Sequence, residues 1–357
     1  MQNQKYQGIL ECDVAVIGGG CIGLSIAAAI SKKGMKVVIV EKGKVGNEAS
    51  WASGGMLKPL TESTGDEKFL KLCMDSLALY PRFIKSLEEE TSMDVEMDTS
   101  GGIVVAMSDK EMENIEKKHA FAAAHGVDTK VLSKHALAKL EPGIVKKAFG
   151  GLLVPTDFQL NNRKLCKALE KSCIMNGVLI LEEEEAKEII EENSNVIGML
   201  TKKRRIKSSI VVNCAGAWSS KINPEIKVKP IRGQMIRLDA SSIDIPGHII
   251  TRHPFYIIPR KDRSIIVGST VEDVGFCKDV TEDGTKSLRN EACSLVPSLE
   301  SCSVIETWAG LRPMADFPYI GKLKRSMYAA TGHYRNGILL TPITAKMISE
   351  EIEGELK

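Results

Sequence analysis

No two of the nine cysteines have the spacing C-x-x-C, and the six histidines lack metal-ligand spacing. Disulfide scaffolds and zinc ribbons require regular cysteine patterns, so both are excluded. Lys and Arg total 48 against 46 for Asp and Glu, which leaves a net charge of only +2. A nucleic-acid-binding surface needs a stronger basic excess. The sequence also lacks repeats and low-complexity tracts. We therefore expect no metal, no nucleic-acid partner and reduced thiols.

One uncharged stretch, residues 14–31, has nearly the length of a membrane span. Gly18, Gly19, Gly20 and Gly23 lie within it, and such a cluster disfavours a continuous helix. A strand, a glycine turn and a helix fit the stretch better. The expectation is a cytoplasmic protein with neither a signal peptide nor a membrane span.

The first 40 residues predict a βαβ unit. Val14–Ile17 and Val37–Val40 are apolar runs of strand length, rich in β-branched residues. Between them, residues 22–33 are rich in Ala and end at Gly34, a helix terminator. Strands joined through a helix in this way run parallel, so both faces of the sheet need cover.

Parallel-sheet signals recur in the middle and at the end of the chain, whereas antiparallel signals lie between them. We expect helices at 66–90 (broken or kinked at Pro81), 109–125, after Ser133, at 162–176 and from an N-cap at Thr341. Strands are expected at 101–107, 178–181, 210–213, 231–238, 255–259, 265–269 and 304–308, with a hairpin between the solvated charge runs 182–185 and 202–205.

A length of 357 residues allows two domains. The fold class is therefore α/β (α+β overall): residues 1–85, 146–224 and 306–357 form a nucleotide-binding domain, interrupted by a second, mixed domain of 86–145 and 225–305.

The segment from Gly18 to Gly23 matches the dinucleotide motif G-x-G-x-x-G between a strand and a helix. Gly18 makes the tight turn, Gly20 admits a pyrophosphate, and Gly23 lets the helix pack closely. Cys21 and Ile22 open the helix whose N-terminal N–H groups face the phosphates. Glu41 ends the second strand, 18 residues after Gly23, where a carboxylate can accept both ribose hydroxyls and disfavours NADP.

Spacing alone leaves the identity of the dinucleotide open. The segment 47–56 follows Glu41 and contains small residues and two adjacent glycines. Such a segment can run along a flat ring system, or it can be a plain surface loop.

Several longer motifs resemble the D-amino-acid-oxidase superfamily of FAD enzymes, and within it the glycine oxidase family of bacterial thiamine-thiazole synthesis. They cover nearly the whole chain in order. The superfamily motifs are 49–57, 212–218, Gly310-Leu311-Arg312-Pro313 and 332–342, and the narrower ones are 230–234, 256–260 and 267–273.

The resemblance implies a Rossmann-like FAD-binding domain with a parallel sheet and a largely antiparallel substrate domain, with FAD bound non-covalently. Glu41 would bind the adenosine ribose, residues 49–57 would follow the flavin, and Ala186 would lie near the adenine. The FAD contacts so implied are Gly18, Gly20, Cys21, Ile22, Gly23, Glu41, Lys42, Ala49, Ser50, Ser53, Gly54, Gly55, Met56, Leu57, Ala186, Cys214, Ala215, Gly216, Trp218, Gly310, Arg335, Asn336, Gly337, Ile338 and Leu339.

Four residues are expected at the substrate. Arg312 is the candidate for the substrate carboxylate, because a guanidinium pairs with it through two hydrogen bonds. Tyr256 can donate its hydroxyl to the same carboxylate, or it is an ordinary sheet tyrosine. Arg335 either closes the pocket or braces its loop, and Met56 lines the ring or only packs. His333 is not expected to act as a base.

The implied activity is oxidation of glycine or a similarly small primary or secondary amine to the imine, which hydrolyses to glyoxylate and ammonia, with O2 reduced to H2O2. Thiazole synthase is an implied partner, and a homo-oligomer is expected. The alternatives are a dehydrogenase for D-amino or imino acids such as hydroxyproline or sarcosine, passing electrons to a carrier or quinone, and a non-catalytic FAD-binding protein. One departure from the family concerns substrate size: Pro254 stands where we expect a histidine, and Phe255 can face the other side of the strand.

Overall fold

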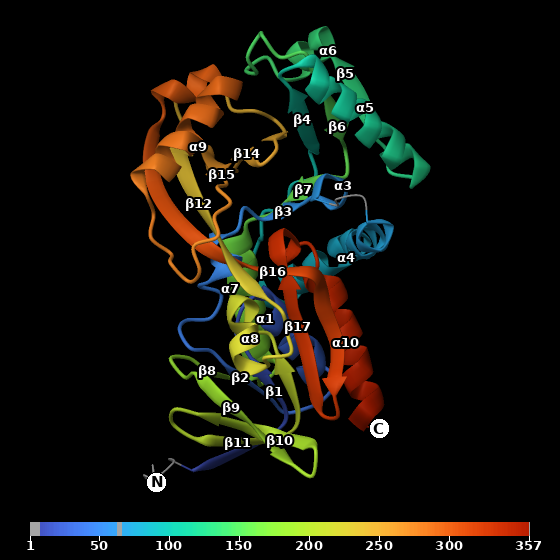
Figure 1. The fold of residues 1–357 in the computed structure, drawn as a ribbon, viewed down its shortest axis with the longest axis vertical. Helices are drawn as coiled ribbons and strands as arrows, with labels where there is room; N and C mark the ends of the chain where they lie inside the picture. The colour runs from blue at the N-terminus through green and yellow to red at the C-terminus, as the bar shows by residue number, and fades with distance from the viewer. Residues whose placement is uncertain (1–7, 63–65, 357) are drawn as a thin grey trace.

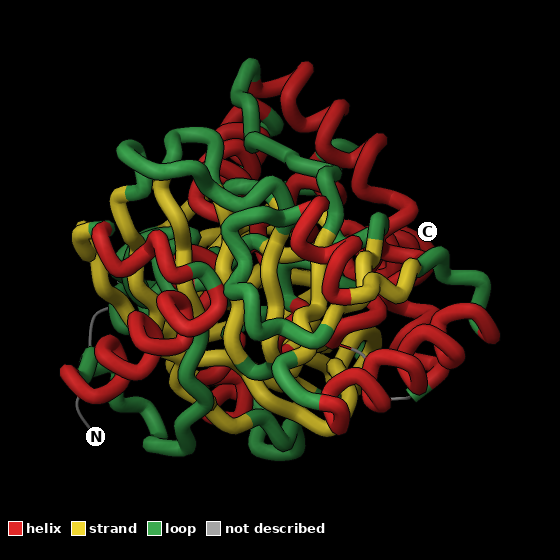
Figure 2. Tube along the Cα trace, turned by 90° about the horizontal axis from the view of Figure 1, so that it is seen from above, coloured by secondary structure: helices red, strands yellow, loops and turns green. Residues whose placement is uncertain are grey.

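The computed structural model describes residues 8–62 and 66–356. Parts of the predicted segments 1–85 and 306–357, namely 1–7, 63–65 and 357, lie outside the described residues. The architecture centres on one sheet of fifteen strands in the order β5-β6-β4-β13-β14-β15-β12-β16-β17-β11-β1-β2-β8, with β10 and β9 attached at β11. The long strands β12 and β16 connect the two halves of the molecule (Figure 1). Figure 2 shows helices lying around the strands of the sheet.

The elements have the following bounds. The strands are β1 Ile9–Ile17, β2 Val37–Val40, β3 Met56–Leu57, β4 Gly102–Ala106, β5 Lys130–Ser133, β6 Gly150–Val154, β7 Phe158–Gln159, β8 Leu179–Leu181, β9 Ala186–Glu192, β10 Asn195–Thr201, β11 Arg205–Asn213, β12 Lys229–Asp239, β13 Ile249–Arg252, β14 Phe255–Pro259, β15 Ser264–Gly268, β16 Ser303–Lys324 and β17 Met327–His333. The helices are α1 Cys21–Ser31, α2 Ala49–Ala52, α3 Pro59–Glu62, α4 Glu67–Thr91, α5 Asp109–Ala124, α6 Lys134–Leu140, α7 Asn162–Met175, α8 Ser219–Ile222, α9 Glu282–Leu295 and α10 Thr341–Leu356, with 3₁₀ turns η1 Gly216–Trp218, η2 Pro297–Ser301 and η3 Tyr334–Asn336.

The parallel part of the sheet consists of β17, β11, β1, β2 and β8. Its strands Val14–Ile17 and Val37–Val40 are buried throughout, as expected for strands covered on both faces. Helices α1, α4, α7 and α10 pack against one another and share one hydrophobic cluster with these strands. This part therefore forms the predicted βαβ unit and extends it.

The other half is largely antiparallel. Strands β13, β14, β15, β12 and β16 pair antiparallel in succession, while β4 pairs parallel with β13 and antiparallel with β6. Helix α9 packs on β12, β14 and β15, and together they bury a second hydrophobic cluster. The predicted class, a parallel sheet combined with a mixed, largely antiparallel part, is confirmed.

Four local predictions need correction. Of the predicted break or kink at Pro81, the break is wrong: helix α4 continues through Pro81, since tertiary packing of the helix, including the fully buried Tyr80, offsets the missing backbone donor. The strand predicted at 304–308 runs on to Lys324. The charged hairpin exists, yet Glu184 is only 2% exposed because Thr201 and Arg204 donate to its carboxylate. Helix α10 begins at Thr341, but its hydroxyl donates to the carbonyl of Gly337 instead of capping.

Among the residues described, no helix combines the length and apolar character that crossing a bilayer requires.

Candidate functional site

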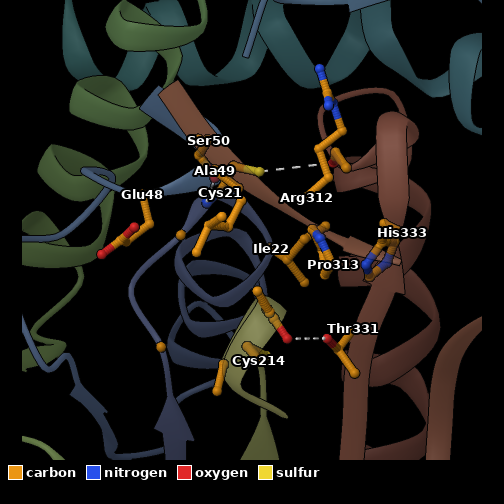
Figure 3. A pocket seen from close by; sticks show the side chains of 18 of the residues that line it. Cys21, Ile22, Glu48, Ala49, Ser50, Cys214, Arg312, Pro313, Thr331 and His333 are labelled. Atoms are coloured by element: carbon orange, nitrogen blue, oxygen red, sulfur yellow. Dashed lines mark hydrogen bonds between the residues drawn. The ribbon is translucent and has the colours of Figure 1, made fainter. Parts of the chain in front are cut away.

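A cavity of about 400 Å³ is lined by residues from both the parallel and the antiparallel parts of the sheet. Its walls come from segments far apart in the chain, among them the start of α1, the loop before α2, β16 and the end of β17 (Figure 3). Glu41 and Ala186 line it beside the parallel strands, whereas Tyr256 and Arg312 line it on the antiparallel strands. The cavity therefore links the predicted dinucleotide site to the predicted substrate residues.

The glycine turn after β1 has the geometry that the motif predicts. Gly18 has φ +101°, which favours glycine, and a Cβ there would overlap the carbonyl of Cys214. A Cβ on Gly23 would overlap the carbonyl of Gly18. Both positions therefore need glycine for the close packing of α1 against the turn.

The carboxylate of Glu41 is held at the end of β2 by two backbone donors. The N–H of Gly19 donates to Oε2 and the N–H of Gly43 to Oε1, each at 2.9 Å. Glu41 is buried, at 7% exposure. Each carboxylate oxygen has a further lone pair, so the fixed group can still accept hydroxyl hydrogens from a ligand.

Beside Glu41, the ammonium of Lys42 lies 2.9 Å from the ring centroid of Trp218. Burial lowers the pKa of Lys42, although its ion pair with Glu48 at 3.4 Å opposes this shift. Both Lys42 and Trp218 line the cavity. The Trp218 ring thus forms an aromatic part of the cavity wall, and the Lys42 ammonium lies over its face as in a cation–π pair.

Two residues without a predicted role hold helix α2 and the turn between α2 and β3. The amide of Asn162 donates to the carbonyls of Ser50 and Trp51 at 2.8 Å. Arg260 donates to the carbonyl of Gly54 at 2.7 Å and to that of Leu160 at 2.8 Å. Arg260 ends the motif 256–260, so a sequence signal for it existed without an assigned function.

Helix α4 anchors the loop before α10 through two side-chain hydroxyl groups. The hydroxyl of Tyr80 donates to the carbonyl of Ile338, and that of Ser76 donates to the carbonyl of Leu339 at 2.6 Å. Both hydroxyl-bearing residues are fully buried. This anchoring holds the segment Asn336–Ile338 along the cavity wall.

Arg312 lies within β16, not after a strand as the sequence indicated. Its Nη1 donates to the carbonyls of Arg232 and Thr270 at 3.3 and 3.2 Å, and its Nη2 donates to Ser269 Oγ at 2.5 Å. The guanidinium lies over Gly233, where any Cβ would overlap it. Several contacts therefore fix the guanidinium at the cavity wall.

Tyr256 is buried on β14, and its hydroxyl donates to Met235 Sδ at 3.2 Å. Its neighbour Phe255 packs against the second hydrophobic cluster on the other side of the sheet, as strand alternation predicts. Met56 and Arg335 also line the cavity.

Two titratable groups at the cavity are held neutral. Burial lowers the pKa of His333 to about 4, and its Nε2 contacts Thr344 Oγ1 at 3.1 Å. Burial raises the pKa of the Cys21 thiol. A neutral thiol is a poor nucleophile, so Cys21 serves as apolar wall. Within the described residues, no group of three or more His, Cys, Asp or Glu is arranged to hold a metal ion.

Almost every predicted site residue lines the cavity. The exceptions are Gly23, which packs on the glycine turn, and Leu57 and Leu339, whose side chains are buried in the hydrophobic cluster around α1. Lining residues that the sequence did not indicate include Lys58, Lys221, Met235 and Thr331. They belong to no motif, and only the tertiary arrangement brings them to the cavity.

Comparison with known proteins gives consistent matches. The family model described as DAO, FAD dependent oxidoreductase, matches residues 13–351. A glycine oxidase of Pseudomonas aeruginosa is 31% identical over 350 residues, 96% of this chain and 94% of that protein. A bifunctional ThiO/ThiG protein of Trichormus variabilis is 32% identical over 348 residues, 95% of this chain and 52% of that protein. The chain thus spans about half the length of this bifunctional relative.

The same similarity holds in three dimensions. The crystal structure of glycine oxidase from Geobacillus kaustophilus matches with a TM-score of 0.93 at 28% identity, covering 97% of this chain and 95% of that chain.

Proposed function

The chain belongs to the FAD-dependent oxidoreductase family, and on this basis we propose that it oxidises glycine or a similarly small primary or secondary amine to the imine. With glycine, O2 and water the products are glyoxylate, ammonia and H2O2. The observation that carries the proposal is that one continuous cavity is lined both by Glu41 and by Arg312. The enzyme is a flavoprotein that acts on amines, as its glycine oxidase relatives indicate.

The residues present fit FAD. A Cβ at Gly18 or Gly23 would disrupt the turn that opens α1, and the two oxygens of Glu41 are preset by Gly19 and Gly43. We propose that the start of α1 binds the pyrophosphate, Glu41 the ribose, and the segment Ala49–Met56 the flavin. The other predicted contacts that line the cavity belong to the same proposal.

When bound, FAD accepts two electrons from the amine and passes them to O2. The chain's own contribution is to bind and orient the substrate. Arg312 binds the substrate carboxylate, since a guanidinium already fixed by neighbouring acceptors loses little further entropy. Tyr256 turns its hydroxyl from Met235 to the same carboxylate, and Arg335 closes the cavity near the substrate. His333, held neutral by burial, takes no proton at neutral pH.

Further parts of the proposal concern organisation. The segments 1–85, 146–224 and 306–357 would form the FAD-binding domain, and 86–145 and 225–305 the substrate domain. The two large hydrophobic clusters support this, because with few exceptions each falls within one set of segments. The bifunctional ThiO/ThiG relatives support a role beside thiazole synthase. The nine cysteines lack the regular spacing of a disulfide scaffold, and this supports a cytoplasmic location. A homo-oligomer is also proposed.

The deciding experiment mixes the purified FAD-loaded protein with glycine or sarcosine without oxygen and records the flavin absorbance. Both amines are expected to bleach the flavin, and admission of O2 is expected to yield one H2O2 per amine oxidised. An unchanged spectrum with both amines contradicts amine oxidation, whereas bleaching without peroxide would indicate the dehydrogenase alternative.

A further inference from the structure

Four side chains from α2, α7 and β16 meet in a cluster that has no role in the proposed reaction so far. The guanidinium carbon of Arg163, on α7, lies 3.7 Å from the ring centroid of Trp51 and 4.8 Å from that of Trp308. The two rings meet edge to face, with their centroids 6.0 Å apart. Nη1 and Nη2 of Arg163 donate to the two carboxylate oxygens of Glu306 at 3.0 and 2.9 Å. We call Trp51, Arg163, Glu306 and Trp308 the Arg163 cluster.

Stability alone does not explain the Arg163 cluster. The side chains of Arg163 and Glu306 are 26% and 29% exposed, and ion pairs so open to water contribute little to the free energy of unfolding. Arg163 nevertheless makes two parallel hydrogen bonds and stacks on two rings, a geometry that only the planar guanidinium allows. Glu306 also lies 3.8 Å from Arg237 on β12. The cluster therefore fixes where its elements lie relative to one another.

The element fixed most directly is helix α2, which contacts the cluster from the cavity side. The indole Nε1 of Trp308 donates to the carbonyl of Ala52 at 3.0 Å. A Cβ on Gly310 would lie 2.4 Å from the Cβ of Ala52, so β16 and α2 touch. Ala52 itself lines the cavity. A helix of four residues has hardly any internal hydrogen bonds, so its position depends on α7 and β16.

Strand β16 connects the Arg163 cluster to the substrate cation. Its pairing with β12 shows no register shift over residues 306–312, and side chains alternate along a strand. One face therefore carries Glu306, Trp308, Gly310 and Arg312. Figure 3 shows Ser50 of α2 and Arg312 of β16 at the same cavity. A shift of α2 relative to β16 would thus change the distance between the predicted flavin segment and Arg312.

We propose that Arg163 is a positioning residue for amine oxidation. By stacking on Trp51 and pairing with Glu306, it holds α2 against β16 and keeps a flavin bound along α2 in line with an amine bound at Arg312. This inference rests on the proposed function, because it takes 49–56 as the flavin segment and Arg312 as the carboxylate site. Loss of the guanidinium slows electron transfer from the amine but leaves substrate affinity unchanged, because the acceptors that fix Arg312 lie on β12 and at 269–270.

The test separates the rate of flavin reduction from substrate affinity. The FAD-loaded protein and Arg163→Met are mixed with sarcosine without oxygen, and bleaching at several concentrations gives the limiting rate constant and the apparent Kd. The limiting rate is expected to fall at least about 10-fold in the variant, since small displacements of reacting groups are costly. The apparent Kd is expected to stay within about twofold. An unchanged limiting rate, or a loss confined to Kd, overturns the proposal.

Conservative variants separate stacking from a general packing defect. Trp51→Phe keeps an aromatic face for the guanidinium and should stay within about threefold of the parent rate, whereas Trp51→Leu should resemble Arg163→Met. Equal losses in the two Trp51 variants overturn the stacking role. Arg252→Met is the matched control, because Arg252 forms a similarly exposed pair with Glu111 at 3.0 Å away from α2. It should change neither constant.

The visible circular dichroism of bound FAD gives a measurement that needs no turnover. Arg163→Met should change this spectrum, because α2 moves, and Arg252→Met should not. If Arg163→Met fails to retain FAD, Glu306→Gln replaces it, since this variant keeps the stacked rings and loses only the ion pair. Spectra identical to that of the parent in the Arg163 and Glu306 variants overturn the positioning role. Absence of bleaching by any amine in the parent protein overturns the proposed function instead.

Discussion

At the scale of single residues, the fixed cations around the cavity are the groups with the largest expected effects. Arg312 is held by three acceptors, and its position at the cavity wall suits a carboxylate. Arg260 is buried as well. Its hydrogen-bond partners are the side chain of Gln159 and the carbonyls of Leu160 and Gly54, and none of these is acidic. The first cation is proposed to bind substrate, whereas the second holds the loop, so their loss should have different consequences.

Replacing Arg312 by Ala should lower kcat/KM for glycine about 100-fold, mainly through KM, because it removes charge-assisted hydrogen bonds to the carboxylate. Steady-state peroxide formation measures this. Arg325→Ala, at an exposed position beyond β16, is the control and should change kcat/KM less than twofold. A loss below threefold for Arg312→Ala would exclude it as the carboxylate site.

Replacing Arg260 by Met should weaken FAD binding and lower the free energy of unfolding by about 2–4 kcal/mol, since it leaves buried carbonyls without donors. Burial lowers the pKa of Arg260 to about 10, so the group is charged at neutral pH. Urea unfolding and flavin fluorescence titration measure the two effects. Arg260→Lys keeps the charge and should recover part of both, and no difference between the two variants would speak against the clamp.

His333 should make the stability depend on pH. Its folded pKa of about 4 lies below the ordinary value of 6.5, so the unfolded state binds a proton more readily between these values. The free energy of unfolding has its full value above pH 6.5, and it falls by up to about 3 kcal/mol as the pH drops to 4. Urea unfolding from pH 7.5 to 4.5 should show a flatter profile for His333→Gln, and parallel profiles would contradict the assignment.

At the scale of elements, the approach of α1 to the glycine turn decides whether the cavity forms. Gly23→Ala places a methyl group against the carbonyl of Gly18, so α1 must move away. We expect a loss of about 1–3 kcal/mol in stability and at least tenfold weaker FAD binding. The matched control is Gly354→Ala in α10, where nothing lies within 4 Å and stability should be unchanged or rise slightly. Equal FAD affinity in the two variants would refute the steric argument.

Element boundaries were harder to predict than element types. Tyr80 and Ser76 on α4 are anchored to the loop before α10, and this packing outweighs the local effect of Pro81. Strand β16 continues past Trp308 because β12 and then β17 provide backbone partners along its length. Partners distant in sequence supply these interactions, and a local pattern does not contain them.

At the scale of the whole molecule, the ligand contributes to the cohesion of both parts of the sheet, because the cavity takes its walls from both. Removing FAD should therefore lower Tm, and adding FAD at 100 times its Kd should restore about 2.7 kcal/mol. Differential scanning calorimetry of the apoprotein with FAD measures this, and NAD at the same concentration is the control. An equal shift with NAD, or none with FAD, would contradict the predicted selectivity.

The sequence alone determined the βαβ unit, the roles of Gly18 and Gly23 and the site of Glu41, because these depend on local chain geometry and on residues close in sequence. It also placed Arg312 and Tyr256 among the site residues, through motifs that extend over several residues. Periodicity and motif spacing carry this information because each element must form from its own residues.

Only the tertiary structure decided which side chains meet in the cavity. Lys58, Asp157 and Thr251 come from three distant segments, and none of them belongs to a motif that predicts a contact. The core positions of Leu57 and Leu339 likewise follow from the packing of α1 and its neighbouring helices. The physical reason is that burial and hydrogen bonding at a shared cavity depend on strand order and register, which long-range pairing sets after the local elements are specified.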